Sequence, residues 1–153
     1  MSDSPRSHVN NGPITSELRR PRILLVDDDP MALRALTRIL ETNQAYWKIS
    51  CAASGEEAMA LIQRETFAVV ITDLVMPGAN GMAVLFQLQQ HQPQAIRIVH
   101  SSHVELLKSG SLGRLAHRVL PKPASAIDVL SVTTWARLQH NQQVEPPKST
   151  RCA

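Results

Sequence analysis

Short apolar runs that alternate with helical segments constrain the fold of this chain more than any other feature. Runs such as Ile23–Val26 and Phe67–Thr72 are apolar on both sides of the strand, so both of their faces need to be covered. We predict five strands, at residues 22–27, 46–52, 67–72, 96–99 and 118–120. Strands of this kind are typical of a parallel sheet that lies between two layers of helices.

Helices are expected between successive strands and after the last one. Apolar residues recur at helical spacing in Met31–Leu40, Ser54–Glu65, Gly81–Gln92 and Ser125–His140. A weaker helix is expected over Val104–Leu115, because Gly110 and Gly113 interrupt the pattern. This alternation, with right-handed crossovers, predicts an α/β fold of the flavodoxin-like, doubly wound (βα)5 type. Its five-stranded parallel sheet is expected to have the strand order 2-1-3-4-5.

The positive charge of the chain lies in its terminal segments. The formal net charge is +3, to which residues 1–22 contribute +2 and residues 141–153 contribute +1, so residues 23–140 are neutral. A nucleic-acid-binding domain is expected to carry its basic excess on the folded surface, which argues against that function. We predict a flexible tail at 1–21, a folded domain at 22–140 and a second flexible tail at 141–153.

Nothing in the chain indicates secretion or membrane insertion. No stretch reaches the roughly 20 apolar residues of a membrane span, and the N-terminus lacks the apolar core of a signal peptide. The two cysteines, Cys51 and Cys152, form no paired motif. We therefore expect Cys51 to be a small buried hydrophobe and the protein to be cytoplasmic, without membrane contact.

Polar residues suited to phosphoryl chemistry follow the predicted strands. Asp27 and Asp28 end the first strand, Asp73 follows the third, and Ser101 and Lys122 follow the fourth and fifth. Because the carboxyl ends of parallel strands meet at one edge of a sheet, we expect these side chains to lie together. Crowded carboxylates need a cation, and their hard oxygen atoms suit Mg²⁺ or Mn²⁺. Lys122 can pair with Asp73 and then hold a phosphate oxygen.

Four motifs resemble the receiver domain of two-component response regulators. They are Ile23–Asp29, Ile71–Gly81, Val99–Ser102 and Leu120–Pro123, and the likeness spans about residues 22–140. The resemblance implies that Asp73 is the phosphoacceptor, Ser101 the switch hydroxyl and Lys122 the phosphate-binding lysine. It implies a Mg²⁺ site formed by Asp27, Asp28 and Asp73, with help from the backbone carbonyl of Val75. It also implies a cis peptide between Lys122 and Pro123.

Several neighbouring residues have a plainer interpretation. Asp29 precedes Pro30 at a helix start and is expected to be an N-cap rather than a metal ligand. Ser102 is an alternative to Ser101 as the switch hydroxyl, although the expected strand end favours Ser101. His100 and His103 are expected to be loop residues rather than a metal pair, and His103 is placed where receivers tune the lifetime of the phosphoryl group.

Two features concern the readout of phosphorylation. Receivers usually carry Tyr or Phe three residues before the lysine, whereas this chain has Val119. The last helix carries two apolar stripes, one with Ile127 and Leu138 and the other with Val129 and Ala136; one of them must face the sheet. Trp135 lies off both stripes and is a candidate contact residue.

The favoured function is a single-domain response regulator that signals by protein–protein contact and is not an enzyme beyond its own phosphorylation and dephosphorylation. Its partners would be a histidine kinase or histidine phosphotransfer protein and an unknown downstream protein, and no DNA-binding domain is expected. Alternatives are a receiver-like scaffold that ignores phosphorylation, a phosphate sink, and a phosphatase of haloacid-dehalogenase type. The last would place its nucleophile after an early strand and would need a cap over the substrate.

Overall fold

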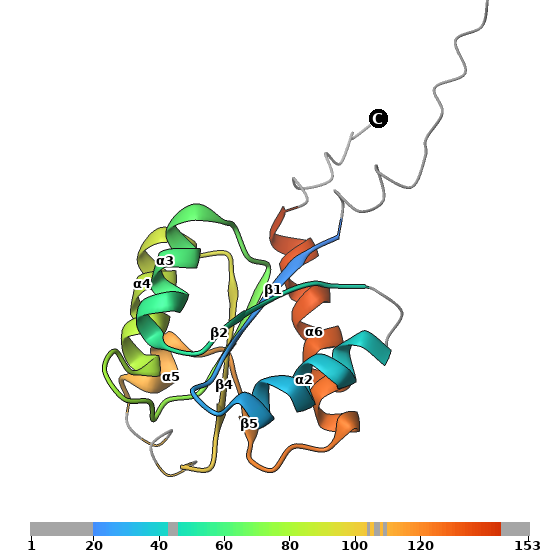
Figure 1. Cartoon of the computed structure of the whole chain (residues 1–153). Coiled ribbons are helices and arrows are strands. Elements are labelled where there is room, and N and C mark those ends of the chain that lie inside the picture. The colour runs from blue at the N-terminus through green and yellow to red at the C-terminus, as the bar shows by residue number, and fades with distance from the viewer. Residues whose placement is uncertain (1–19, 43–45, 104, 106–107, 109, 145–153) are drawn as a thin grey trace, which may run out of the picture.

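The computed structural model describes residues 20–42, 46–103, 105, 108 and 110–144. Five parallel strands form one sheet in the order β2-β1-β3-β4-β5 (Figure 1). They are β1 (Arg22–Val26), β2 (Lys48–Ala52), β3 (Val69–Thr72), β4 (Ile96–Ser101) and β5 (Arg118–Pro121). The helices are α2 (Pro30–Thr42), α3 (Gly55–Arg64), α4 (Gly81–His91), α5 (Leu112–Leu115) and α6 (Ala126–Val144). The flavodoxin-like fold and its strand order are thus confirmed.

Helices cover both faces of the sheet, with α2 and α6 on one face and α3, α4 and α5 on the other. In β1 the apolar side chains alternate between these layers: Ile23 and Leu25 pack toward α2 and α6, and Leu24 and Val26 toward α3 and α4. All four are almost fully buried. The strand is apolar throughout because helices remove both of its faces from water.

Short polar side chains begin three of the helices. Asp29 accepts a hydrogen bond from the N–H of Met31 at 2.9 Å, which agrees with the expected N-cap of α2. Ser54 accepts from the N–H of Glu57 at 3.1 Å and caps α3 in the same way. Asn80 accepts from the N–H of Ala83 at 3.2 Å, directly after the loop that follows β3. These caps end each loop sharply, so the strand ends and helix starts stay close together.

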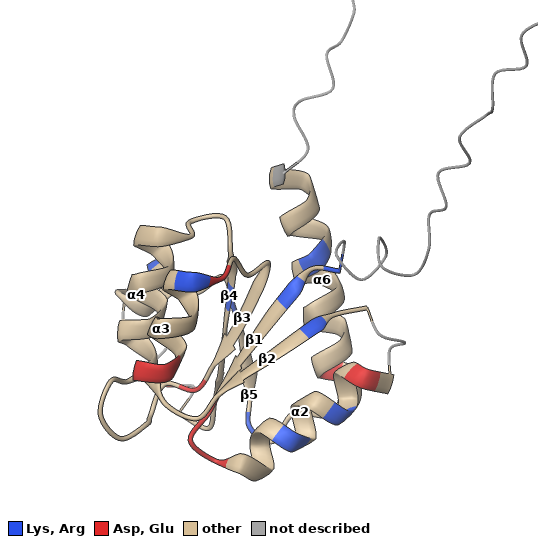
Figure 2. Cartoon of the chain, turned by 45° about the horizontal axis from the view of Figure 1, so that its top comes forward, with Lys and Arg blue, Asp and Glu red and all other residues tan. Residues whose placement is uncertain are grey.

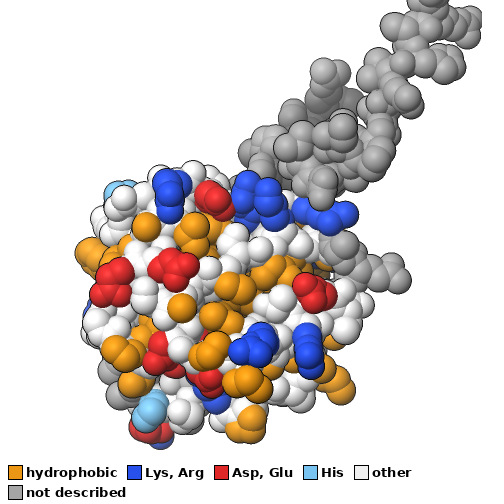
Figure 3. All heavy atoms as spheres, in the orientation of Figure 1, with side chains coloured by type: hydrophobic (Ala, Val, Ile, Leu, Met, Phe, Trp, Pro, Cys, Tyr) orange, Lys and Arg blue, Asp and Glu red, His pale blue; other side chains and the backbone are white. Residues whose placement is uncertain are grey.

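Some sequence predictions are wrong. The expected helix over Val104–Leu115 is not continuous: among the described residues only Leu112–Leu115 forms an α-helix, and 104, 106, 107 and 109 lie outside them. Cys51 is exposed rather than buried, because β2 is the edge strand. Exposure of a small hydrophobic side chain is not unusual in this molecule, because hydrophobic and charged side chains are interspersed on the face seen in Figure 3. The last helix ends at Val144 rather than His140.

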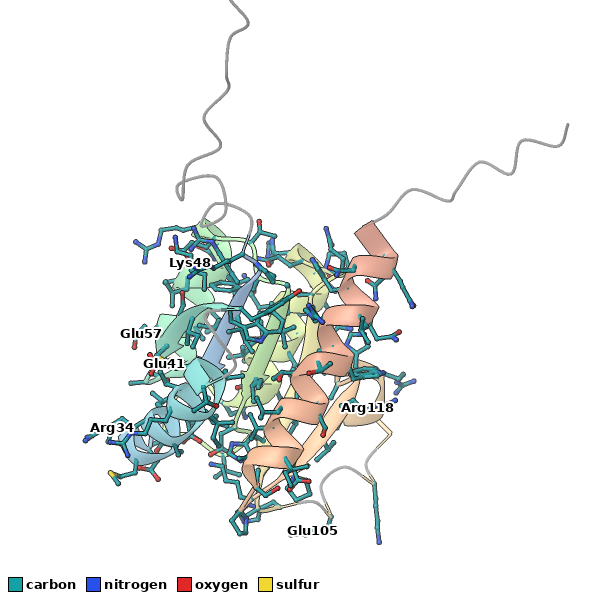
Figure 4. The ribbon with its side chains drawn as sticks, turned by 90° about the vertical axis from the view of Figure 1, so that its right-hand side faces the viewer. Arg34, Glu41, Lys48, Glu57, Glu105 and Arg118 are labelled. Atoms are coloured by element: carbon teal, nitrogen blue, oxygen red, sulfur yellow. The ribbon has the colours of Figure 1, made fainter. Side chains whose placement is uncertain are left out.

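Helix α6 turns one of its two apolar stripes toward the sheet. Val129 and Ala136 are fully buried, whereas Ile127 and Leu138 are exposed by 76% and 50%. Trp135 packs against the core and under the guanidinium of Arg118, which lies 4.3 Å from the ring centroid (Figure 4). These contacts give Trp135 a structural role. No helix in the described ranges has the length and apolar character needed to cross a bilayer.

Candidate functional site

Three carboxylates meet at the carboxyl edge of the sheet. Asp27 directly follows β1 and Asp73 directly follows β3, and these strands are neighbours in the sheet. Oxygen atoms of Asp27, Asp28 and Asp73 all lie within 4.8 Å of one another. Figure 2 shows the acidic segment that joins β1 to α2. Asp27 is buried, Asp73 is 8% exposed and Asp28 faces solvent, so the cluster has a closed base and an open side.

Lys122 joins two of these carboxylates. Its Nζ donates to Oδ2 of Asp27 at 2.7 Å and to Oδ2 of Asp73 at 3.0 Å. Burial disfavours the charged ammonium group, but these hydrogen bonds and charges outweigh burial and raise the pKa of Lys122. The side chain therefore stays charged at neutral pH. The contact with Asp73 was expected from the sequence, whereas the shorter contact with Asp27 was not.

The backbone around Asp73 holds its carboxylate in place. The N–H of Asp73 donates to the carbonyl of Val26 at 2.9 Å, which ties it to the end of β1. The N–H of Val75 donates to Oδ1 of Asp73 at 3.3 Å, so the backbone of Val75 lies against the carboxylate. Gly81 lies so close that a Cβ atom there would be 2.0 Å from the carbonyl oxygen of Asp73. The need for glycine at this close approach was not foreseen.

Ser101 and His100 are adjacent in β4 and point to opposite faces of the sheet. Ser101 is 1% exposed, and its Oγ accepts a hydrogen bond from the N–H of His103 at 3.1 Å. Ser102 is exposed and lies within 3.3 Å of the ring of His103, which leaves Ser101 as the buried hydroxyl. The prediction that His100 is a loop residue is wrong, because β4 continues to Ser101 and buries it. His103 does follow the strand, as expected.

The acidic cluster fits a divalent cation. When ionised, Asp27, Asp28 and Asp73 carry three negative charges, of which Lys122 offsets one. A divalent cation would offset the remaining two, and oxygen ligands of this kind suit Mg²⁺. Asp29 is engaged in capping α2 and lies outside the group of three. The peptide between Lys122 and Pro123 is cis, as expected.

Comparison with known proteins points to one family. The model of the response regulator receiver domain family matches residues 23–134. The transcriptional activator protein ExaE of Pseudomonas putida is 34% identical over 132 residues, which cover 86% of this chain and 61% of that protein. The chain spans between 29% and 61% of the length of four curated relatives.

Solved structures agree with this match. A CheY-like response regulator receiver domain protein from Methanospirillum hungatei superposes with a TM-score of 0.73 at 26% identity, covering 80% of this chain and 98% of that one. The response regulator TrrA of Thermotoga maritima, solved in complex with Mg(2+)-BeF, has the same fold. Its TM-score is 0.70 at 24% identity, over 76% of this chain and 98% of that one.

Proposed function

The chain belongs to the response regulator receiver domain family, and from this premise we propose that Asp73 is its phosphoacceptor. Receiver domains take phosphoryl groups from histidine kinases and bind Mg²⁺ at an acidic pocket. We propose that this chain accepts the group from the phosphohistidine of a histidine kinase or histidine phosphotransfer protein. The observation that carries this proposal is the contact of Lys122 with Asp73 inside a group of three carboxylates.

Each side chain of the site has a role in this transfer. An oxygen of the Asp73 carboxylate attacks phosphorus, and a new O–P bond forms as the N–P bond of the donor breaks, its electron pair staying on the imidazole. Lys122 already donates to Asp73, and it can turn one N–H toward a phosphoryl oxygen. The hydroxyl hydrogen of Ser101 can be donated to another phosphoryl oxygen while its Oγ still accepts from His103.

Asp27, Asp28, Asp73 and the carbonyl of Val75 would hold a Mg²⁺ ion, whose charge would offset the negative charge brought by the phosphoryl group. Asp27 is fixed by Lys122 and by the N–H of Asp29, which donates to its Oδ1 at 3.0 Å. A fixed ligand loses little freedom when the ion binds. Asp28 is exposed and lies at the open side of the cluster, so its carboxylate would be accessible to an ion from solvent.

Phosphorylation by a small donor tests this proposal. Incubation with phosphoramidate and Mg²⁺ should add the mass of one phosphoryl group, and chelation of the metal should suppress the addition. Asp73→Asn should abolish the addition. Asp29→Asn is the matched control and should leave it unchanged, because Asp29 caps α2 without contributing to the acidic group. Undiminished labelling of Asp73→Asn would show that the acceptor is another residue.

A passive phosphate sink is the second candidate function, and Val119 is the observation that favours it. Val119 packs with Leu85, Val99 and Leu112 on the α4–α5 side, where an aromatic side chain would be needed for the usual ring rotation. In an active switch, phosphorylation would therefore be read through Ser101 and the segment that follows it. The haloacid-dehalogenase alternative is disfavoured by the family match and by the position of Asp73 after β3.

We propose that another protein recognises the phosphorylated state of this chain. ExaE is named a transcriptional activator and is longer than this chain, so the expected lack of a DNA-binding domain stays a prediction. The single-domain organisation and the absence of any further enzyme activity also stay predictions. A pull-down with beryllofluoride-treated protein, compared with the Asp73→Asn variant treated in the same way, would identify partners of the activated state.

A further inference from the structure

A groove lies beside the phosphoacceptor site, between α2 and the loop that joins β5 to α6. Its volume is about 470 Å³, which is within the range of small-molecule pockets. Its walls are mainly apolar and include Ala32, Leu36, Ile39, Pro123 and Ala124. The groove therefore offers a surface that favours an apolar body over water.

A buried histidine lies at the base of this groove. His100 comes from the end of β4, lines the groove and is only 6% exposed. Neither of its ring nitrogens has a hydrogen-bond partner among the described residues, and both are covered by neighbouring atoms. Leaving buried polar atoms unpaired is unfavourable. Because His100 lines the groove, a bound group that reaches its ring could pair with one of these nitrogens.

The imidazole is neutral in this environment. Burial lowers the pKa of His100, and the positive charge of Lys122 lowers it further, against the opposing effect of Asp27 and Asp73. A neutral imidazole has one N–H donor and one nitrogen acceptor. It is therefore suited to a hydroxyl group, which both donates and accepts.

Two charged side chains, those of Asp29 and Lys122, line the groove. Asp29 accepts from the N–H of Met31 at the start of α2, and Lys122 is paired with Asp27 and Asp73. Arg34 points outward from α2, away from α6 (Figure 4). An anionic ligand would find no unpaired cation among the lining residues, and its charge would lose hydration without compensation. A cationic ligand would find only the carboxylate of Asp29, which is exposed, so that water largely screens its attraction. A neutral ligand avoids this cost.

We propose that the groove binds a small neutral molecule with an aromatic or branched aliphatic body and one hydroxyl group, which pairs with the imidazole of His100. This site is distinct from the acidic cluster: His100 and Ser102 line the groove, whereas Ser101 does not, as expected from the alternation of side chains along a strand. Lys122 is the shared wall: it lines the groove and also binds Asp73. A bound molecule would thus lie beside the phosphoacceptor without occupying the metal site.

Titration of the full chain with three small probes tests this proposal by protein NMR. Phenol should shift the methyl signals of Leu36 and Ile39 and the ring signals of His100, with a Kd of about 1–20 mM. Benzene, which lacks the hydroxyl, should bind at least about threefold more weakly. Benzoate, which is charged, should give no saturable shift. Equal binding of phenol and benzene, or shifts centred outside the groove, would overturn the proposal.

Two variants separate the polar contact from the apolar walls. His100→Leu should remove the preference for phenol over benzene while benzene still binds. Ala35 is exposed and lines the groove, so Ala35→Leu narrows the groove without altering the core. It should weaken the binding of phenol by at least about fivefold. Ala60→Leu on the exposed side of α3 is the matched control and should leave phenol binding unchanged. Unchanged phenol binding in Ala35→Leu would exclude this groove as the binding site.

Discussion

Gly81→Ala should be among the most destabilising small substitutions in this protein. The added Cβ would lie 2.0 Å from the carbonyl oxygen of Asp73 and 2.8 Å from the Cα of Leu74. An ordinary contact is about 3.5 Å, so the start of α4 or the end of β3 would have to move by about 1.5 Å. Both are backbone atoms, and Gly81 N–H donates to the carbonyl of Leu74 at 3.1 Å, so neither side yields without loss of structure.

The expected loss in the free energy of unfolding is about 3 kcal/mol, at the upper end of ordinary overpacking. This corresponds to a fall in Tm of about 12 °C for a domain of this size. Urea denaturation followed by circular dichroism measures the loss. Because the displaced carbonyl belongs to Asp73, phosphorylation by a small donor should also slow at temperatures where the variant is folded.

Gly113→Ala is the matched control. Gly113 lies in α5, and nothing approaches within 4 Å of the position of its missing Cβ. Alanine has the higher helix propensity, so this substitution should stabilise the protein by up to about 1 kcal/mol. If the free energy of unfolding of Gly81→Ala is within about 0.5 kcal/mol of that of the unmodified protein, the close approach of α4 to Asp73 is refuted.

The remaining predictions concern the metal, the histidine and the readout. Asp28→Asn should weaken Mg²⁺ binding at least about tenfold, whereas Asp29→Asn should not; equal losses in a calorimetric titration would contradict the assignment. Burial lowers the pKa of His100 below its unfolded value of about 6.5, so the unfolded chain takes up the proton first and stability should fall as pH drops below about 6.5. Denaturation at several pH values should show a smaller fall in His100→Leu, and an equal fall would exclude His100 as a source. Beryllofluoride should alter amide exchange mainly in residues 101–118 and less in Ser101→Ala; no change in either protein favours the phosphate sink.

The layered fold could be predicted because the residue pattern of each strand shows whether helices cover one or both of its faces. Leu24 and Leu25 point to opposite layers and are both apolar, which is the pattern of a strand covered on both faces. The acidic site was predictable for the same reason, since Asp27 and Asp73 follow strands of this kind. Their meeting at one edge is a consequence of parallel topology.

The segment after β4 could not be predicted because tertiary contacts define it. Gly110 and Gly113 weaken the helix pattern, and the short α5 depends on burial of Leu112 and on Arg97. The buried guanidinium of Arg97 donates to the carbonyl of Leu115 at the end of α5 and to the carbonyls of Pro93 and Ala95. An arginine within an apolar strand gives no signal for this role in the sequence.

The predictions that His100 lies in a loop and that Cys51 is buried were wrong because the apolar pattern does not show how far β4 extends or which strand lies at the edge of the sheet. β4 continues beyond Val99, since β5 offers backbone partners to His100 and Ser101. Cys51 lies on the same face of β2 as the apolar Ile49, but β2 is an edge strand with less cover than β1. Alternation predicts which residues share a face, whereas the cover over that face depends on the neighbouring elements.

Chemical trapping of the phosphorylated residue tests the central claim most directly. Borodeuteride reduces an aspartyl phosphate to a deuterated homoserine as phosphate leaves, so the acceptor can be located by mass spectrometry of peptides. After treatment with phosphoramidate and Mg²⁺, the label should be found at Asp73 and should disappear when the metal is chelated. Label at Asp27 or Asp28, or label that is independent of the metal, would contradict the account.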